Sequence, residues 1–238
     1  MGRIGFRPDE ATETVARIAA LPGVVCGGAF THFATADDAD LAYVHEQHAL
    51  FLKALDLIAA KGISIPLRHC CNSGGTLSFP QWAMDGVRPG QIVCGMYPTE
   101  HVPRSLPVLP GFSFKTAVAA LRTLPPGQGV SYGLTYVTRS EERLAVLPLG
   151  YADGFARPLS NRGEVLIRGT RCRVAGRICM DQCMVNVSHL PEVSVGDEVV
   201  VIGPQGGDEI SIYEYAEKLD TIVAAIGAMI SKRVPRVY

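Results

Sequence analysis

The stretch 23-GVVCGGAFTHFA-34 is an apolar run that ends in polar residues. A run of this length, bounded by glycines and rich in apolar side chains, predicts a buried strand. The next segment, 37–60, has apolar residues at helical spacing, and 63-ISIPLRHCCNS-73 then repeats the strand pattern with a polar end. Strand, helix and strand in this order predict parallel strands with a crossover helix, and barrel enzymes place their sites at the carboxyl ends of such strands.

The same alternation continues on both sides of this unit. A short helix is predicted over 9–20, and 86-GVRPGQIVCGMY-97 is predicted to supply one or two more short strands. Counted generously, this part of the chain offers about five strands, whereas a closed barrel uses about eight. We therefore expect a partial TIM-type (β/α) barrel.

After the Pro-rich connection 98-PTEHVPRSLPVLPG-111, the pattern changes to short strands separated by Gly and Pro. Such a pattern predicts an antiparallel β domain. The expected strands lie in 114–124, 143–151, 163–176, 184–188 and 198–203, with a closing helix over 212–231. The predicted organisation is an α/β part, residues 1–103, followed by a C-terminal β domain with its closing helix, residues 104–238.

Composition argues against several classes of protein. The 238 residues are 47% hydrophobic and 19% charged with a net charge of −1, which gives no basic surface of the kind that nucleic acid attracts. No apolar run approaches the roughly 20 residues that span a bilayer. The seven cysteines match neither a disulfide framework nor paired zinc-binding spacings. We expect a cytoplasmic protein with no nucleic-acid or membrane partner.

No metal site is expected. The stretch 44-VHEQH-48 lacks the H-E-x-x-H spacing that puts two ligands and a base on one helix face. His45 and His48 are therefore predicted to lie on a solvated helix face.

Candidate chemistry in the first part lies at the predicted strand ends. His32, His69 and Ser73 follow strands, and Ser73 with the two glycines after it resembles a phosphate cradle, where backbone N–H groups approach an anion. Arg88 lies close to another glycine, Gly90. A histidine at such a position, taken alone, is more often a satisfied core residue.

Two turns in the second part could also carry chemistry. The stretch 130-VSYGLTYV-137 places Tyr132 between small residues, and 175-AGRICMDQCMVNVS-188 places Met180 after a tight turn. Taken alone, the first is more typical of a turn tyrosine that packs its ring, and the second of a β-turn with a core methionine.

Eight ordered motifs together resemble the alanine racemases, the pyridoxal-phosphate enzymes that supply D-alanine to bacterial cell walls. The motifs are 1-MGRIGF-6, 31-THFATAD-37, 69-HCCNSGG-75, 88-RPGQIVCGMYP-98, 129-GVSYGLTYV-137, 147-LPLGYADGFAR-157, 176-GRICMDQCMVNVS-188 and 232-KRVPRVY-238. The resemblance runs from Met1 to Tyr238. It implies a TIM-type barrel followed by a β domain, a pyridoxal 5'-phosphate cofactor, alanine as substrate, and a homodimer with sites at the subunit interface.

The resemblance also implies which residues act on protons. Racemisation needs a base on each face of the substrate Cα. One base would be Tyr132, reaching into the partner subunit's site, with the histidine at position 32 stabilising its phenolate. Arg88 would hydrogen-bond the pyridine nitrogen of the cofactor and so suppress competing reactions.

The remaining implied contacts hold the cofactor and the substrate. Ser73 and the backbone at Gly90 and Gln91 would bind the cofactor phosphate, and His69 would belong to the same cofactor site. For the substrate carboxylate the resemblance implies Arg3 and the Met180 N–H, with Tyr151 lining the entrance.

Two departures from the family pattern stand out. The family's other base is a lysine that binds the cofactor covalently and precedes the "GRIGF" motif, and none of Lys53, Lys61, Lys115, Lys218 and Lys232 lies in a matching segment. We therefore expect a fragment that begins inside the fourth barrel strand, is inactive alone, and needs an N-terminal barrel part, which a separate chain could supply. The second departure is Ala224, which aligns with a phosphate-binding tyrosine, so cofactor retention should be weaker.

Two functions remain open from the sequence. The chain either belongs to a racemase that works once the upstream strands are supplied, or is a non-catalytic remnant or dimerisation module. A related decarboxylase is disfavoured because it should carry a different cysteine-aspartate motif. A single-barrel pyridoxal-phosphate-binding protein is disfavoured because it lacks the β domain. The choice among alanine, serine and other substrates is left open.

Overall fold

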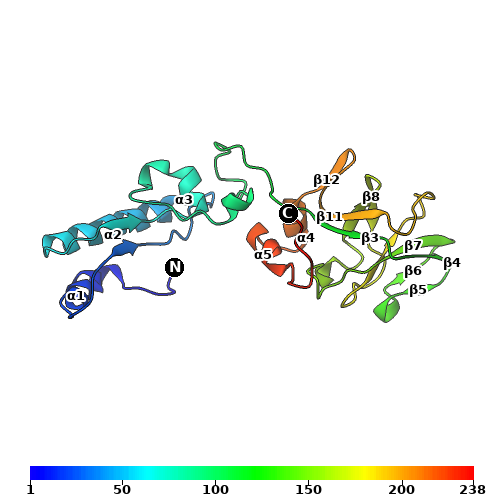
Figure 1. The fold of residues 1–238 in the computed structure, drawn as a ribbon, viewed down its shortest axis with the longest axis horizontal. Helices are drawn as coiled ribbons and strands as arrows, with labels where there is room; N and C mark the ends of the chain where they lie inside the picture. The colour runs from blue at the N-terminus through cyan, green and yellow to red at the C-terminus, as the bar shows by residue number, and fades with distance from the viewer. The chain divides into compact units, whose positions relative to one another are not determined.

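The structure, a computed structural model, describes residues 1–238 and divides them into two compact units, Met1–Pro110 and Gly111–Tyr238 (Figure 1). The division falls at the end of the Pro-rich connection, later than the 103/104 boundary expected from the sequence. The connection packs on the first unit: a Cβ added to Gly95 would meet the Leu109 carbonyl oxygen at 1.6 Å. Residues up to the end of the connection therefore belong with the barrel-like part.

The first unit has the predicted strand-helix-strand order. Its elements are α1 (Pro8–Ala19), β1 (Gly28–Phe30), α2 (Ala42–Ala60), β2 (Leu67–His69), α3 (Ser73–Ser78) and the 3-10 helices η1 (Pro80–Trp82) and η2 (Gln91–Cys94). β1 and β2 pair in parallel, with Phe30 opposite His69, and α2 is the crossover helix between them. This is the arrangement expected of a partial (β/α) barrel.

Several of the predicted elements are shorter than expected, and one is wrong. Segment 86–97, predicted to supply one or two strands, forms η2 instead. Gly95 ends η2 in the left-handed region, at φ 78°, and Pro89 has no N–H for a strand ladder. Helix α2 begins at Ala42 and not at residue 37, because the Asp40 carboxylate accepts the Ala42 N–H at 2.9 Å. Of the five predicted strands, only β1 and β2 form.

One of the two core clusters of the first unit packs against Trp82. The buried residues there are Phe33, Ala36, Val44, Cys70, Cys71 and Phe79. His48 stacks on the Trp82 indole at a centroid distance of 4.0 Å, and burial lowers the pKa of this imidazole. The prediction that His48 lies on a solvated face is therefore wrong, because ring stacking on the indole half-buries it. His45 is exposed as predicted, although its ring edge meets Trp82 at 5.0 Å.

The second unit is an antiparallel β domain, as predicted. Its strands are β3 (Phe114–Ala117), β4 (Ala120–Leu124), β5 (Gly129–Val130), β6 (Tyr136–Val137), β7 (Glu142–Leu147), β8 (Glu164–Ile167), β9 (Thr170–Arg173), β10 (Cys183–Asn186), β11 (Glu198–Gln205) and β12 (Asp208–Ile210). Its helices are η3 (Tyr132–Leu134), η4 (Arg157–Leu159), α4 (Ile212–Lys218) and α5 (Val223–Met229). One sheet has the order β12-β11-β8-β9 with β3 on β11, a second has β10-β7-β4, and β5 and β6 form a hairpin.

Segment 114–124 was predicted as one strand and forms two. After β3 the chain leaves β11 and joins β7, because the Val118 N–H donates to the Asp197 carbonyl at 3.0 Å and the Ala119 N–H donates to the Val146 carbonyl at 2.9 Å. The bend lets one segment contribute to both large sheets.

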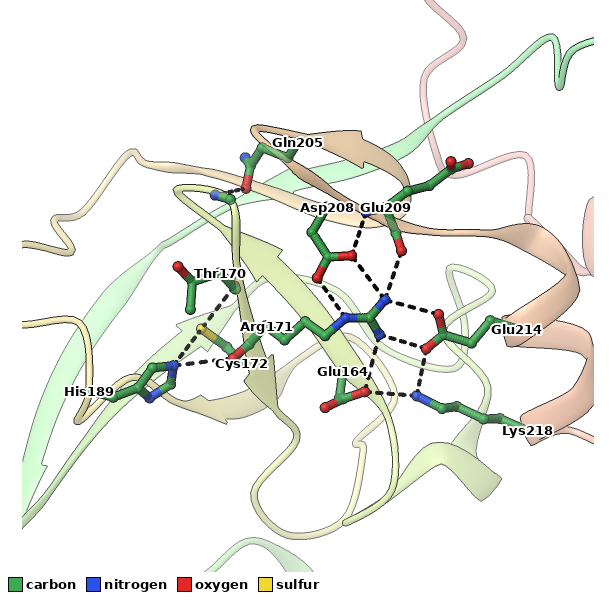
Figure 2. Close-up of polar contacts among 11 residues, drawn as sticks. Glu164, Thr170, Arg171, Cys172, His189, Gln205, Asp208, Glu209, Glu214 and Lys218 are labelled. Carbon is green, nitrogen blue, oxygen red and sulfur yellow. Dashed lines mark hydrogen bonds and ion pairs between the residues drawn. The ribbon is translucent and has the colours of Figure 1, made fainter.

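Arg171, on β9, lies at the centre of an ion-pair network (Figure 2). Its Nε and Nη2 bond the Asp208 carboxylate at 2.8 and 3.2 Å, and its Nη1 and Nη2 bond the Glu214 carboxylate at 2.8 and 3.1 Å. Lys218 bonds Glu164 at 2.9 Å and Glu214 at 2.8 Å. The network therefore fastens α4 to the edge of the sheet that contains β8, β9 and β12.

The closing helix predicted over 212–231 is broken into α4 and α5. Asp220 adopts φ 51°, which a right-handed helix does not tolerate. On α5 the side chains of Val223 and Ile226 are buried, whereas Ala224 is exposed. Position 224 is thus not part of the core. No helix of the chain combines the length and the apolar character needed to cross a bilayer.

Candidate functional site

The residues expected to hold a cofactor ring meet at the carboxyl ends of β1 and β2. Arg88 Nη1 bonds the Nδ1 of His69, and Arg88 Nη2 donates to the Thr31 carbonyl at 2.9 Å. The Nδ1 of His32 lies 3.4 Å from the same Nη2. The guanidinium carbon is 4.9 Å from the centroid of the Phe30 ring. Arg88 therefore contacts the ends of both parallel strands.

Arg88 also decides which imidazole nitrogens carry protons. A guanidinium only donates hydrogen bonds, so the Nδ1 atoms of His32 and His69 that face it must accept. Burial, and after it the charge of Arg88, lowers the pKa of both imidazoles below the usual value. Both rings are therefore neutral near a pH of about 7, with the proton on Nε2. The Nε2–H of His32 can then donate a hydrogen bond to an oxygen.

The hydroxyl of Ser73 lies next to Gly90, whereas the two glycines after Ser73 pack against Asp37 and Phe33. Ser73 is buried at the start of α3, which Asn72 caps by accepting the Gly75 N–H at 2.9 Å. The Ser73 Oγ accepts the Gly90 N–H at 2.9 Å, so the hydroxyl proton remains to be donated. A Cβ built on Gly90 would have only that Oγ nearby, at 4.0 Å. The residues present therefore fit a phosphate group. The buried Oε1 of Gln91 has no partner.

Tyr132 lies in the loop of the β5–β6 hairpin and is 71% exposed. This exposure contradicts the alternative of a turn tyrosine that packs its ring. The Ser131 Oγ donates to the Arg177 carbonyl at 2.6 Å, which fastens the hairpin to the turn that carries Met180. A cavity of about 290 Å³ beside this contact is lined by Ser131, Tyr132, Cys179, Gln182 and Met184.

The Met180 turn packs on the loop 150–154. The Tyr151 N–H donates to the Cys179 carbonyl at 3.0 Å, and the Ala152 N–H donates to the Met180 carbonyl at 2.8 Å. Met180 is 56% exposed, so it is not the core methionine that the isolated turn suggested. Its N–H donates to no group of the chain and can meet a carboxylate. The loop and the turn thus place Tyr151 next to Met180.

Asp153 ties the same loop to the C-terminal motif. Its buried carboxylate accepts the Gly150 N–H at 2.9 Å and pairs with the Arg233 Nε at 3.3 Å. The Ser231 N–H donates to the Asp153 carbonyl at 3.1 Å. Motifs that are far apart in the sequence therefore converge in one region of the β domain.

The predicted site residues fall into two groups, one in each unit. The first unit holds Arg3, His32, His69, Ser73, Arg88, Gly90 and Gln91, and the second holds Tyr132, Tyr151 and Met180. Arg3 is exposed and makes no hydrogen bond, although its charge contributes to the lowered pKa of His32. The pairing of His32 with Tyr132, which the resemblance implies, stays a prediction.

No lysine hydrogen-bonds to the Arg88 cluster. Lys61 pairs with Glu13 at 2.6 Å, and Lys115 pairs with Glu198 at 3.0 Å. Lys218 belongs to the Arg171 network. Lys61, Lys115 and Lys218 therefore pair with carboxylates and not with the Arg88 cluster.

Sequence reasoning missed Ser131 and Asp153 as supporting residues. An aspartate directly before a glycine in a loop is a known turn signal and could have drawn attention to Asp153. Ser131 had no local signal, because its partner Arg177 is distant in the sequence.

A larger cavity, of about 660 Å³, lies elsewhere in the β domain. Arg139, Arg173 and His189 are among its lining residues, and none of the predicted site residues is. The larger cavity of this unit therefore does not contain the predicted site residues.

Comparison with known proteins places both units in one family. Residues 1–98 match the family model described as "Alanine racemase, N-terminal domain", and residues 111–238 match "Alanine racemase, C-terminal domain". An alanine racemase of Halothermothrix orenii is 45% identical over 238 residues, and one of Desulfovibrio desulfuricans is 46% identical. The matches cover 100% of this chain but 63% of each relative.

Solved structures show the same similarity. An alanine racemase from E. faecalis superposes with a TM-score of 0.92 at 35% identity, covering 100% of this chain and 63% of that one. One from Bacillus anthracis with bound L-Ala-P superposes with a TM-score of 0.93 at 37% identity, covering 100% of this chain and 61% of that one. The chain therefore spans a little under two thirds of the proteins it resembles.

Proposed function

This chain belongs to the alanine racemase family, and we propose that it carries the cofactor cradle, the substrate carboxylate site and one proton-transfer group of a pyridoxal-phosphate-dependent alanine racemase. The observation that carries the proposal is Arg88, which His69 and the Thr31 carbonyl hold while its Nε–H stays unpaired. An arginine can donate to a pyridine nitrogen but cannot readily protonate it. This favours simple proton exchange at the substrate Cα over competing reactions.

The cofactor would be held by residues of the first unit. Arg88 would donate to the ring nitrogen. The Ser73 hydroxyl and the Gln91 N–H would hold the phosphate, and the Gly90 N–H, which donates to the Ser73 Oγ, would orient that hydroxyl. When bound, pyridoxal 5'-phosphate withdraws electrons and so acidifies the substrate Cα–H. The buried position of Ser73 and the open space at Gly90 support this assignment.

Tyr132 would take and return the proton on one face of the Cα. A free tyrosine has a pKa of about 10, so its phenolate needs a donor, and the Nε2–H of His32 would supply it. The base for the other face would be the family lysine, which lies outside the matched segment. Tyr132 and His32 lie in different units, and we propose, from the family resemblance, that they meet across a homodimer.

Arg3 and the Met180 N–H would bind the substrate carboxylate, with Tyr151 at the entrance. The exposed Arg3 guanidinium and the unpaired Met180 N–H support this assignment.

All seven cysteines are free thiols, which favours a reducing cytoplasm.

The test uses the chain joined, ahead of Met1, to the N-terminal barrel residues of the Halothermothrix orenii relative. This protein should convert L-alanine into D-alanine, and the 238-residue chain alone should not. In deuterium oxide, Tyr132→Phe should slow α-proton exchange from L-alanine by about 10²–10⁴-fold and affect D-alanine far less.

The matched control is Tyr43→Phe, at an exposed tyrosine on α2, which should leave both rates unchanged. Equal losses in the two directions would remove Tyr132 from its one-sided role. A joined protein that binds the cofactor yet racemises nothing would favour a dimerisation module.

A further inference from the structure

The loop that carries Tyr132 has an unusual backbone. Ser131 adopts φ 61° and ψ −174°, a region that is essentially restricted to glycine. Gly133 and Leu134 follow with φ values of 71° and 46°. A serine and a leucine are thus held in conformations that L-residues avoid, directly beside the proposed base. Backbone strain of this kind persists only where the surroundings fix it.

The surroundings of this loop come from the Met180 turn. The Ser131 Oγ donates to the Arg177 carbonyl at 2.6 Å and lies 3.5 Å from the Cys179 Sγ. The Arg177 guanidinium covers Gly133 so closely that an added Cβ would lie 2.9 Å from Nη1. Gly176 approaches the hairpin on the other side, where an added Cβ would meet the Val130 carbonyl oxygen at 2.7 Å. The hairpin and the turn are therefore interlocked.

We infer that Ser131 is a positioning residue, whose hydroxyl holds Tyr132 in register with the Met180 turn so that the phenol meets one face of the substrate. The inference rests on the proposed function, because it assigns Tyr132 the role of a base. A glycine would adopt the Ser131 backbone conformation without strain. What the serine adds is the hydrogen bond to Arg177, which joins the segment that would deliver the base to the segment that would bind the substrate carboxylate.

Two variants separate the hydroxyl from the backbone. Ser131→Ala removes the hydrogen bond and keeps the strain, whereas Ser131→Gly removes both. If Ser131 served stability alone, Ser131→Gly would be tolerated because it relieves strain. If Ser131 positions Tyr132, both variants should show the same change in hydrogen exchange and in kcat. The control is Ser140→Ala, at an exposed serine whose Oγ reaches only the Glu141 carbonyl, at 3.4 Å.

The first readout needs no activity. In the 238-residue chain, hydrogen exchange should become faster by about tenfold in both variants at the hydrogen-bonded amides of Leu134, Ile178 and Cys179. Strand β7 and the control should be unchanged. Unchanged exchange at Ile178 and Cys179 in Ser131→Gly would overturn the inference.

The second readout uses the joined racemase. Small misplacements cost about 10²-fold in rate. Ser131→Gly should therefore lower the kcat of α-proton exchange from L-alanine by that order with KM little changed. The kcat of α-proton exchange from D-alanine should fall much less. Tyr132→Phe is measured first and should also lose more exchange from L-alanine than from D-alanine. The absence of this difference would overturn the proposed function. If Tyr132→Phe shows the asymmetry and Ser131→Gly does not, the positioning role of Ser131 alone is wrong.

Discussion

The Nη2 of Arg88 donates to the main-chain carbonyl of Thr31 at 2.9 Å. A side chain from the segment between η1 and η2 thus satisfies the carboxyl end of β1, and its Nη1 bonds His69 at the end of β2. One guanidinium thereby orients both histidines of the proposed site and selects their tautomers. Changes at Arg88 should consequently be visible in the titration of His32 and His69.

Arg88→Gln should raise the pKa of His32 and His69 towards the ordinary histidine value. Burial is the larger cause of the lowered values and would remain, so both should stay somewhat low. NMR titration of the imidazole Cε1–H signals measures both. Arg68→Gln is the control, since Arg68 lies next to His69 in β2 but pairs with Asp85 at 2.8 Å. Equal shifts in the two variants would contradict the Arg88 assignment.

Arg171→Met should lower the free energy of unfolding by about 1–3 kcal/mol. The variant loses the bonds to Asp208 and Glu214, so that Lys218 alone pairs with Glu164 and Glu214 and Asp208 loses its ion pair (Figure 2). Urea unfolding monitored by circular dichroism gives the value. Arg122→Met, at an exposed arginine of β4, should change stability by less than about 0.5 kcal/mol. A similar loss in both variants would mean that the network adds nothing specific.

Acid should destabilise the β domain through the same network. The bonds to Arg171 hold the pKa of Glu214 and Asp208 below their ordinary values of 4.5 and 3.8. Since the folded pKa is the lower one, the stabilisation is full above the ordinary value and is lost as the pH falls through the folded value. We therefore expect the free energy of unfolding, measured between about pH 6 and pH 3, to fall more steeply once the pH is below the ordinary pKa values of the two carboxylates. In Arg171→Met this dependence should be flatter, and an unchanged dependence would assign the acid loss to other groups.

Ala224→Tyr should tighten pyridoxal 5'-phosphate in the joined racemase by up to about tenfold. The exposed position of Ala224 on α5 leaves room for the ring, so the melting temperature should hold. Cofactor affinity measured by absorbance titration tests this. Ala228→Tyr, at an exposed position one turn further along α5, should bring no gain. A lower melting temperature with no gain in affinity would show that residue 224 does not align with the phosphate-binding tyrosine.

Local sequence predicted much of this arrangement. The helix pattern of 37–60 between two apolar runs was enough for the parallel pair β1 and β2, because helical and strand periodicity are local properties. Ser73 and Gly90, both singled out from the sequence, are hydrogen-bonded to each other in the structure, and their binding of a phosphate stays a prediction. The antiparallel β domain likewise followed from short strands between turn residues.

Tertiary contacts decided the rest. Segment 86–97 reads as strand, yet it folds as η2 because the Gly95 backbone lies against Leu109. The sequence predicts a solvated His48, yet its ring stacks on Trp82.

Ser131 reads as a small neighbour of Tyr132, yet its hydroxyl reaches Arg177, 46 positions away in the sequence. Residue pattern alone therefore determined the β1–α2–β2 unit, the antiparallel character of the second unit and which side chains could do chemistry. Only packing between distant segments decided how those side chains are held, because hydrogen bonds and stacking depend on neighbours in space that no local period records.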